Sequence, residues 1–138
     1  MNRSIMLAAL LSLVASVAAH AEQRTTKSGV FSAEQAKNGE LNFQSRCAAC
    51  HGTDLIATNP EAPDLTEEGF KFGWIGKTVG NRFNNIRISM PQGAPGSLDD
   101  QTYLDIVTYI LSFNGMPAGS KKLVPDMATL EEIMIEKP

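Results

Sequence analysis

Apolar residues recur at helical spacing between residues 33 and 46, and the first helix is expected there. Ser32 precedes this segment and Gln35 lies three positions later, which is the sequence of an N-terminal capping box. The apolar face consists of Ala36, Gly39, Phe43 and Cys47. A glycine in mid-helix costs about 1 kcal/mol relative to alanine. Gly39 therefore marks either a close crossing by another helix or a tolerated weak position.

A second helical pattern extends from about residue 74 to residue 88. Its apolar positions are Ile75, Val79, Phe83 and Ile86. Gly76 and Gly80 interrupt the pattern and would allow two short helices in place of one. Pro91 disfavours helical geometry at Met90, so the pattern ends there and a loop begins.

The strongest helical pattern runs from residue 98 to residue 113, with Ser97 as its expected N-cap and Asp100 at the third position. Its wide apolar stripe predicts a buried helix that packs on the first one. The stripe consists of Tyr103, Leu104, Ile106, Val107, Tyr109, Ile110, Leu111 and Phe113. Asn114 and Gly115 provide a C-terminal stop.

The two remaining segments are a loop and a tail. Residues 52–65 contain Pro60 and Pro63 and show no sustained period, so a loop is expected. Residues 121–138 carry a weaker pattern, which predicts a short helix lying on the surface with its acidic residues toward solvent. The apolar positions of this tail are Met127, Leu130, Ile133 and Met134. No segment alternates as a strand does, and we predict an all-α fold.

The first residues have the pattern of an export signal. Arg3 provides a positive start, an apolar run covers residues 5–19, and Ala19-His20-Ala21 has the small-x-small form of a signal-peptidase site. The run is shorter than the roughly 20 residues of a membrane-spanning helix, which disfavours the alternative of an uncleaved anchor. We therefore expect cleavage after Ala21, with residues 22–138 forming one periplasmic domain without a membrane span.

Net charge and the number of His and Cys residues limit the possible partners and ligands of the exported chain. The full chain carries 12 Lys and Arg against 15 Asp and Glu, a formal net charge of −3. Such an acidic balance argues against a nucleic-acid partner. Removal of residues 1–21 would also remove His20 and leave His51 as the only histidine, with Cys47 and Cys50 as the only cysteines.

These three residues form the pentapeptide Cys47-Ala48-Ala49-Cys50-His51, the sequence by which one haem c is covalently attached. Two cysteines at this spacing lie on one side of a turn, and the adjacent histidine can supply an axial ligand to the iron.

Three other interpretations use part of the pentapeptide. A thioredoxin-like redox pair belongs in a strand-to-helix context that the surrounding sequence lacks. Structural zinc usually takes four ligands, and the exported chain offers three. A simple disulfide gives no reason for the histidine. One covalent haem is therefore the predicted cofactor.

The other axial position of the iron has no second histidine to fill it. Met90 lies in a turn between two helices, far enough after His51 for the chain to pass around the haem edge, and it is the predicted ligand. Met116 is the second candidate, and an open site is the third. Met127 and Met134 fit the apolar face of the tail, where methionine usually packs.

These residues resemble class I cytochrome c over nearly the whole exported chain. The resemblance implies the cytochrome c fold, with helices packed around one haem. It implies that the Pro63 carbonyl accepts a hydrogen bond from the ring N–H of His51. It also implies that Trp74 reaches a haem propionate and that Met90 is the distal ligand. Gly39 would pack against Tyr109 of the last strong helix.

Two loop sequences resemble a more specific group within this family. Residues 90–98 and 114–119 are similar to small bacterial cytochromes and cytochrome domains that accept electrons from quinoprotein alcohol dehydrogenases. The chain departs from the family in the short segment between Trp74 and Met90 and in its acidic balance.

The resulting hypothesis is a monomeric periplasmic electron carrier that is not an enzyme. It would cycle one haem between Fe(III) and Fe(II), accepting electrons from a periplasmic dehydrogenase and passing them to a terminal oxidase or another cytochrome. One alternative is a haem enzyme or sensor with a labile sixth site, for which the sequence offers no distal acid–base group. Another is a fixed cytochrome subunit of a dehydrogenase complex, with the tail and the Met116 loop as docking surface.

Overall fold

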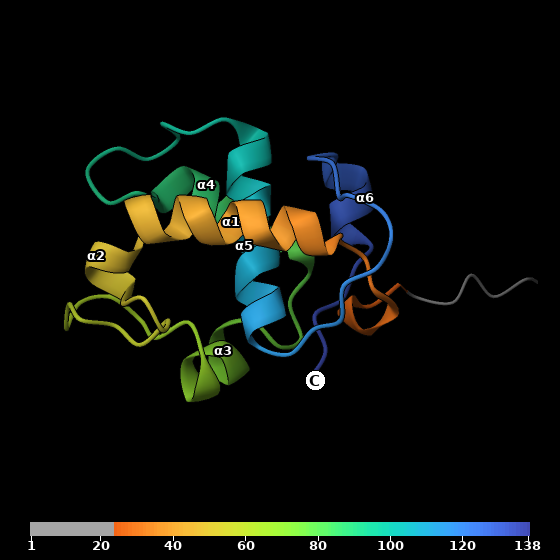
Figure 1. Ribbon diagram of the computed structural model, residues 1–138, viewed down its shortest axis with the longest axis horizontal. Helices are drawn as coiled ribbons and strands as arrows, with labels where there is room; N and C mark the ends of the chain where they lie inside the picture. Colours follow the sequence, from red (N-terminus) through yellow and green to blue (C-terminus); the bar gives the residue numbers. More distant parts are fainter. Residues whose placement is uncertain (1–23) are drawn as a thin grey trace, which may run out of the picture.

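Helices joined by loops make up the computed structural model, which describes residues 24–138 (Figure 1). The predicted signal peptide, residues 1–21, lies outside this part. Three isolated β-bridges and no β-sheet are present in the described range, so the predicted all-α class is confirmed. The elements are the 3-10 helix η1 (Thr26–Ser28) and the helices α1 (Ala33–Arg46), α2 (Ala48–His51), α3 (Glu67–Gly73), α4 (Val79–Ser89), α5 (Asp100–Phe113) and α6 (Met127–Glu131).

The start of α1 is capped as predicted, but its capping box is only half formed. The Ser32 hydroxyl accepts a hydrogen bond from the Gln35 backbone N–H at 3.1 Å. Gln35 does not return the bond, because its buried side chain donates to Asp105 Oδ1 at 2.9 Å and to the Leu123 carbonyl at 3.0 Å. This side chain therefore joins α1 to α5 and to the tail.

Helices α1 and α5 cross at the centre of the fold (Figure 1). A Cβ on Gly39 would lie 1.9 Å from the Asp105 carbonyl oxygen and 2.9 Å from Tyr109 Cβ. Only a residue without a side chain permits this approach, so the predicted close crossing at Gly39 is confirmed. The rings of Phe43 and Tyr109 then pack with their centroids 5.3 Å apart.

The helix expected from residue 74 to residue 88 is partly wrong. A separate helix, α3, ends at Gly73, and Trp74 closes it by donating its N–H to the Phe70 carbonyl at 2.9 Å. A turn follows in which Gly76 has φ 79°. Helix α4 then begins after Thr78, whose hydroxyl accepts from the Asn81 N–H. It ends at Ser89, next to Met90 and Pro91, as expected.

Helix α5 begins later than predicted. Its N-cap is Asp99, whose carboxylate accepts from the Thr102 N–H at 3.0 Å, so the prediction of Ser97 as N-cap is wrong. Serine and aspartate both favour the N-cap position, and Asp99 lies only two residues after Ser97. The other end is as predicted: α5 ends at Phe113, and Gly115 follows with φ 88°.

The tail contains the predicted short helix, α6, but the helix ends before Ile133 and Met134, which the sequence pattern places on its apolar face. Its helical part is limited to α6, and Ile133 and Ile135 are buried. The Met134 N–H donates to the Arg24 carbonyl at 3.0 Å, and its carbonyl accepts from Thr26 at 2.9 Å. Extended pairing to the first described residues thus anchors the tail. Its acidic side chains are exposed as predicted, namely Glu131, Glu132 and Glu136. Across residues 24–138, no helix has the length and apolar character needed to cross a membrane.

Candidate functional site

Helix α2 places the two predicted cysteines and the histidine on a single turn directly after α1. Cys47 ends α1 by donating its N–H to the Phe43 carbonyl at 2.8 Å. Its own carbonyl accepts from the N–H groups of Cys50, at 3.1 Å, and His51, at 3.0 Å. Both thiols are free and partly buried. The structure therefore brings the three residues of the motif together and mounts them on the long helix that crosses α5.

The ring of His51 is buried and held by one hydrogen bond. Its Nδ1 lies 3.0 Å from the Pro63 carbonyl oxygen, the contact that the resemblance to class I cytochrome c implies. A carbonyl oxygen only accepts, so Nδ1 carries the proton and Nε2 has a free lone pair. None of the described residues forms a hydrogen bond with Nε2. The imidazole is thus oriented and in the tautomer that binds a metal through Nε2.

Residues 52–65, here called the His51 loop, are closely bonded to α2. The N–H groups of Thr58 and Asn59 both donate to the Cys50 carbonyl, at 2.9 and 3.1 Å. The Asp64 carboxylate accepts from the Ala57 N–H at 2.7 Å. The loop begins at Gly52, where φ is 74° and ψ is 155°, a conformation that is essentially restricted to glycine. These bonds fix the carbonyl of Pro63 against the histidine ring.

The electrostatics of the Cys47 thiol do not fit a reactive redox cysteine. Burial raises the pKa of Cys47 to about 11, while the nearby charge of Arg46 opposes this shift only in part. Redox cysteines need the opposite change, because the thiolate is the reactive form. Within residues 24–138, no group of three His, Cys, Asp or Glu side chains is arranged to hold a metal ion.

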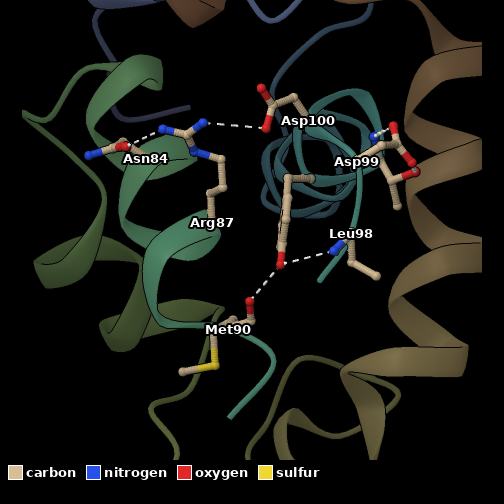
Figure 2. Close-up of polar contacts among 8 residues, drawn as sticks. Asn84, Arg87, Met90, Leu98, Asp99 and Asp100 are labelled. Atoms are coloured by element: carbon tan, nitrogen blue, oxygen red, sulfur yellow. Dashed lines mark hydrogen bonds and ion pairs between the residues drawn. The ribbon is translucent and has the colours of Figure 1, made fainter. Parts of the chain in front are cut away.

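Met90 lies at the end of α4, apart from α2. Its backbone is extended, its side chain is partly buried, and its carbonyl accepts a hydrogen bond from the Tyr103 hydroxyl at 2.7 Å. In Figure 2 the thioether points away from Leu98. The second candidate ligand, Met116, is 3% exposed and belongs to the hydrophobic core. Of these two methionines, Met90 is the more accessible one.

Trp74 lies where α3 ends, with only 3% of its surface exposed. Its indole stacks on Phe70, with ring centroids 5.5 Å apart. The Arg82 guanidinium lies 5.9 Å from the indole centroid and donates to the Gly73 carbonyl at 3.0 Å. Partial burial lowers the pKa of Arg82 below its usual value, but an arginine in this range stays charged.

Three polar groups near these residues were not identified from the sequence. Arg82 lies over Trp74, the Tyr103 hydroxyl contacts Met90, and the Asn114 amide donates to the Leu65 carbonyl at 2.9 Å. Tyr103 had been assigned only to the apolar stripe of α5. The available signal was its chemistry, since a buried tyrosine hydroxyl usually finds a polar partner.

The comparison with protein families agrees with this geometry. An all-helical fold that presents two cysteines and an oriented histidine on one turn defines a haem-binding protein of the c type. The family model described as "Cytochrome C oxidase, cbb3-type, subunit III" matches residues 34–110, which is more than half of the chain.

The chain therefore belongs to this cytochrome c family. Its fold is the cytochrome c fold, its cofactor is covalently bound haem c, and its chemistry is haem-based electron transfer. Neither the curated proteins nor the solved structures contain a match to the chain.

Proposed function

We propose that this cytochrome is a monomeric periplasmic electron carrier with one haem. In this proposal Cys47 and Cys50 form the thioether bonds, and His51 and Met90 are the two axial ligands of the iron. The observation that carries the proposal is the 3.0 Å contact between His51 Nδ1 and the Pro63 carbonyl, on the same turn as both thiols. It leaves Nε2 as the ligating atom beside two cysteines available for attachment.

The donor set fits haem c, which supplies a one-electron Fe(III)/Fe(II) couple when bound. The Pro63 carbonyl keeps the proton on His51 Nδ1 and raises the basicity of Nε2. The thioether of Met90 is a soft, neutral donor that favours the reduced metal. We therefore expect a midpoint potential above that of a haem with two histidine ligands.

Trp74 and Arg82 fit a role next to a haem propionate. The indole ring is buried, and its N–H group is a hydrogen-bond donor. The Arg82 guanidinium beside it adds a positive charge. In the proposal the indole donates to a propionate and the guanidinium lowers the electrostatic cost of holding that anion.

The remaining parts of the proposal concern location and partners. Residues 1–21 would be removed after Ala21, and residues 22–138 would act as one periplasmic domain. The donor would be a periplasmic dehydrogenase, as the similarity of residues 90–98 to cytochromes that serve quinoprotein alcohol dehydrogenases suggests. The acceptor would be a terminal oxidase or another cytochrome, and the description of the matched family, which names an oxidase, supports this direction.

The optical spectrum of the oxidised holoprotein tests the axial ligands. Methionine bound to ferric haem iron gives a weak band at long wavelength, which we expect in the wild type. Met90→Ala should abolish the band, lower the midpoint potential and let imidazole bind the iron. Met116→Leu, which keeps an apolar side chain in the core, is the matched control and should leave all three unchanged. A band that survives in Met90→Ala would contradict the proposal.

A fixed subunit of a larger complex is the second candidate, because the matched family is described as a subunit. Purification from the native host separates the two. A free carrier should elute at the size of the single chain. Co-elution with a large redox enzyme through salt and detergent washes would favour the subunit.

A further inference from the structure

Residues 90–98, here called the Met90 loop, connect α4 to α5 with few contacts of their own. Residues 92–97 are exposed, and the backbone hydrogen bond within the loop joins the Ala94 N–H to the Pro91 carbonyl at 2.9 Å. A Cβ on Gly93 would meet nothing within 4 Å. An open hollow of about 270 Å³ lies beside the loop, lined in part by Pro95 and Gly96. The middle of the loop therefore does little to hold Met90 in place.

One buried hydroxyl holds both ends of this loop. The Tyr103 hydroxyl donates to the Met90 carbonyl at 2.7 Å and accepts from the Leu98 N–H at 3.4 Å. Figure 2 shows the two dashed contacts, one to each end of the loop. The Tyr103 ring is 1% exposed and lies in the first turn of α5. Both ends of the Met90 loop are thus attached to the helix that crosses α1.

The other tie between α4 and α5 is weaker. Arg87 Nη1 lies 3.4 Å from Asp100 Oδ1, and the two side chains are 37% and 50% exposed. Exposed pairs of this kind contribute little, because water and salt screen them. The hydrogen bonds of the Arg87 side chain go to Asp100 and Asn84 and not to the Met90 loop. The Tyr103 hydroxyl is therefore the side chain that positions the Met90 backbone.

We propose that Tyr103 is the positioning residue for the axial methionine and keeps competing ligands off the iron. The inference rests on the proposed function, since it takes Met90 as an iron ligand. A thioether is a weak donor, so its bond to iron persists only if the backbone that carries it stays in place. When Met90 dissociates, the Tyr103 hydroxyl keeps its carbonyl fixed, so the sulfur rebinds before a small molecule can replace it. By retaining Met90, the Tyr103 hydroxyl would favour electron transfer over the binding of small molecules at the iron.

Tyr103→Phe tests the inference, because it removes one oxygen and keeps the ring in the core. In the ferric holoprotein we expect imidazole to bind about five- to tenfold more tightly, as the loss of the hydrogen bond to the Met90 carbonyl predicts. We also expect faster amide hydrogen exchange across residues 90–98, with covalent haem retained. Asp100→Asn, which breaks the other α4–α5 tie, is the control and should change neither result.

The outcomes separate the two proposals. If Tyr103→Phe has the same imidazole affinity and amide exchange as the wild type, the inference about Tyr103 is overturned. Loss of the long-wavelength band in Met90→Ala would still support methionine ligation in that case. A band that persists in Met90→Ala would overturn both. If Tyr103→Phe does not fold, exchange in the wild-type holoprotein decides. A slowly exchanging Leu98 amide together with rapidly exchanging amides at Gly93 and Gly96 supports the inference, and rapid exchange at Leu98 overturns it.

Discussion

The two loops that carry the candidate site are held in different ways. The His51 loop is bonded along its length, by two N–H groups to the Cys50 carbonyl and by the Asp64 carboxylate to Ala57. The Met90 loop is attached at its ends, through the hydroxyl of Tyr103. The side on which the covalent bonds would form is therefore rigid by itself. The side that carries Met90, the proposed second ligand, depends on a neighbouring helix.

The largest effect is expected when the covalent attachment on the His51 side is removed. The double variant Cys47→Ala, Cys50→Ala should contain no covalent haem, because no thiol remains to add to the porphyrin. Met90→Ala should keep its haem, since the attachment lies on the other side. Haem staining of the denatured proteins on a gel measures both. Covalent haem in the double variant would show that the motif is not the point of attachment.

A pair of glycines tests whether the loops differ in rigidity. Gly52→Ala should lower the free energy of unfolding by about 3 kcal/mol, because the backbone strain there adds to a Cβ that would lie 2.0 Å from the Ile56 carbonyl oxygen. Gly93→Ala should cost about 1 kcal/mol, since φ is 90° but no atom lies within 4 Å. Urea unfolding of the two holoproteins measures the difference. Equal losses would mean that the loops are equally constrained.

Trp74→Phe probes the segment between the two loops. Phenylalanine keeps the stack on Phe70 but removes the indole N–H, so a propionate would lose a donor and gain effective negative charge. Negative charge near the iron stabilises the ferric state, and the midpoint potential should fall. Redox titration measures it, with Phe72→Leu on the exposed surface as the control. An unchanged potential in Trp74→Phe would remove the tryptophan from the site.

The smallest expected effect concerns the cap of the helix that holds the Met90 loop. The pKa of Asp99 is lowered, first by the hydrogen bond from the Thr102 hydroxyl and then by its N–H. A carboxyl group whose pKa is lower in the folded protein stabilises the fold at pH values above its pKa in the unfolded chain, about 3.9. This stabilisation is lost as the pH falls through the pKa of the folded protein.

Asp99→Ala should therefore have a lower urea midpoint than the wild type at pH 7, and the gap should narrow below about pH 4. Solvent screening keeps this effect small, because the carboxylate is exposed. A gap that stays constant from pH 7 to pH 3 would mean that the charge of Asp99 does not contribute.

Local patterns predicted the parts of the fold that local physics determines. The cap at Ser32, the stop after Phe113 and the close crossing at Gly39 each follow from a residue type and its neighbours. The predicted start of α5 was two residues too early, because Ser97 and Asp99 both favour the N-cap position. The short helix of the tail was predicted, but the extended segment after it was not. The pairing of Met134 with Arg24 joins residues far apart in the sequence, and helical periodicity carries no information about such a pair.

In the candidate site, too, local geometry was predicted from the sequence and contacts between distant residues were not. The pentapeptide places Cys47, Cys50 and His51 within one turn, so its geometry is local and the sequence predicts it. The contact of His51 with Pro63 came from the family resemblance. The role of Tyr103 could not be predicted, because it depends on how the first turn of α5 meets the end of α4, and the sequence shows that residue only as one apolar position among many.

One helix touches both sides of the site. Near its start, α5 holds the Met90 loop through Tyr103, and at its end the Asn114 amide donates to the Leu65 carbonyl, where the His51 loop finishes. With a rise of 1.5 Å per residue, about 16 Å of continuous helix separates the two attachments. The spacing between the two loops is set by a single stiff piece of backbone. With haem bound as proposed, this backbone would leave the two loops little freedom to shift when the oxidation state of the iron changes.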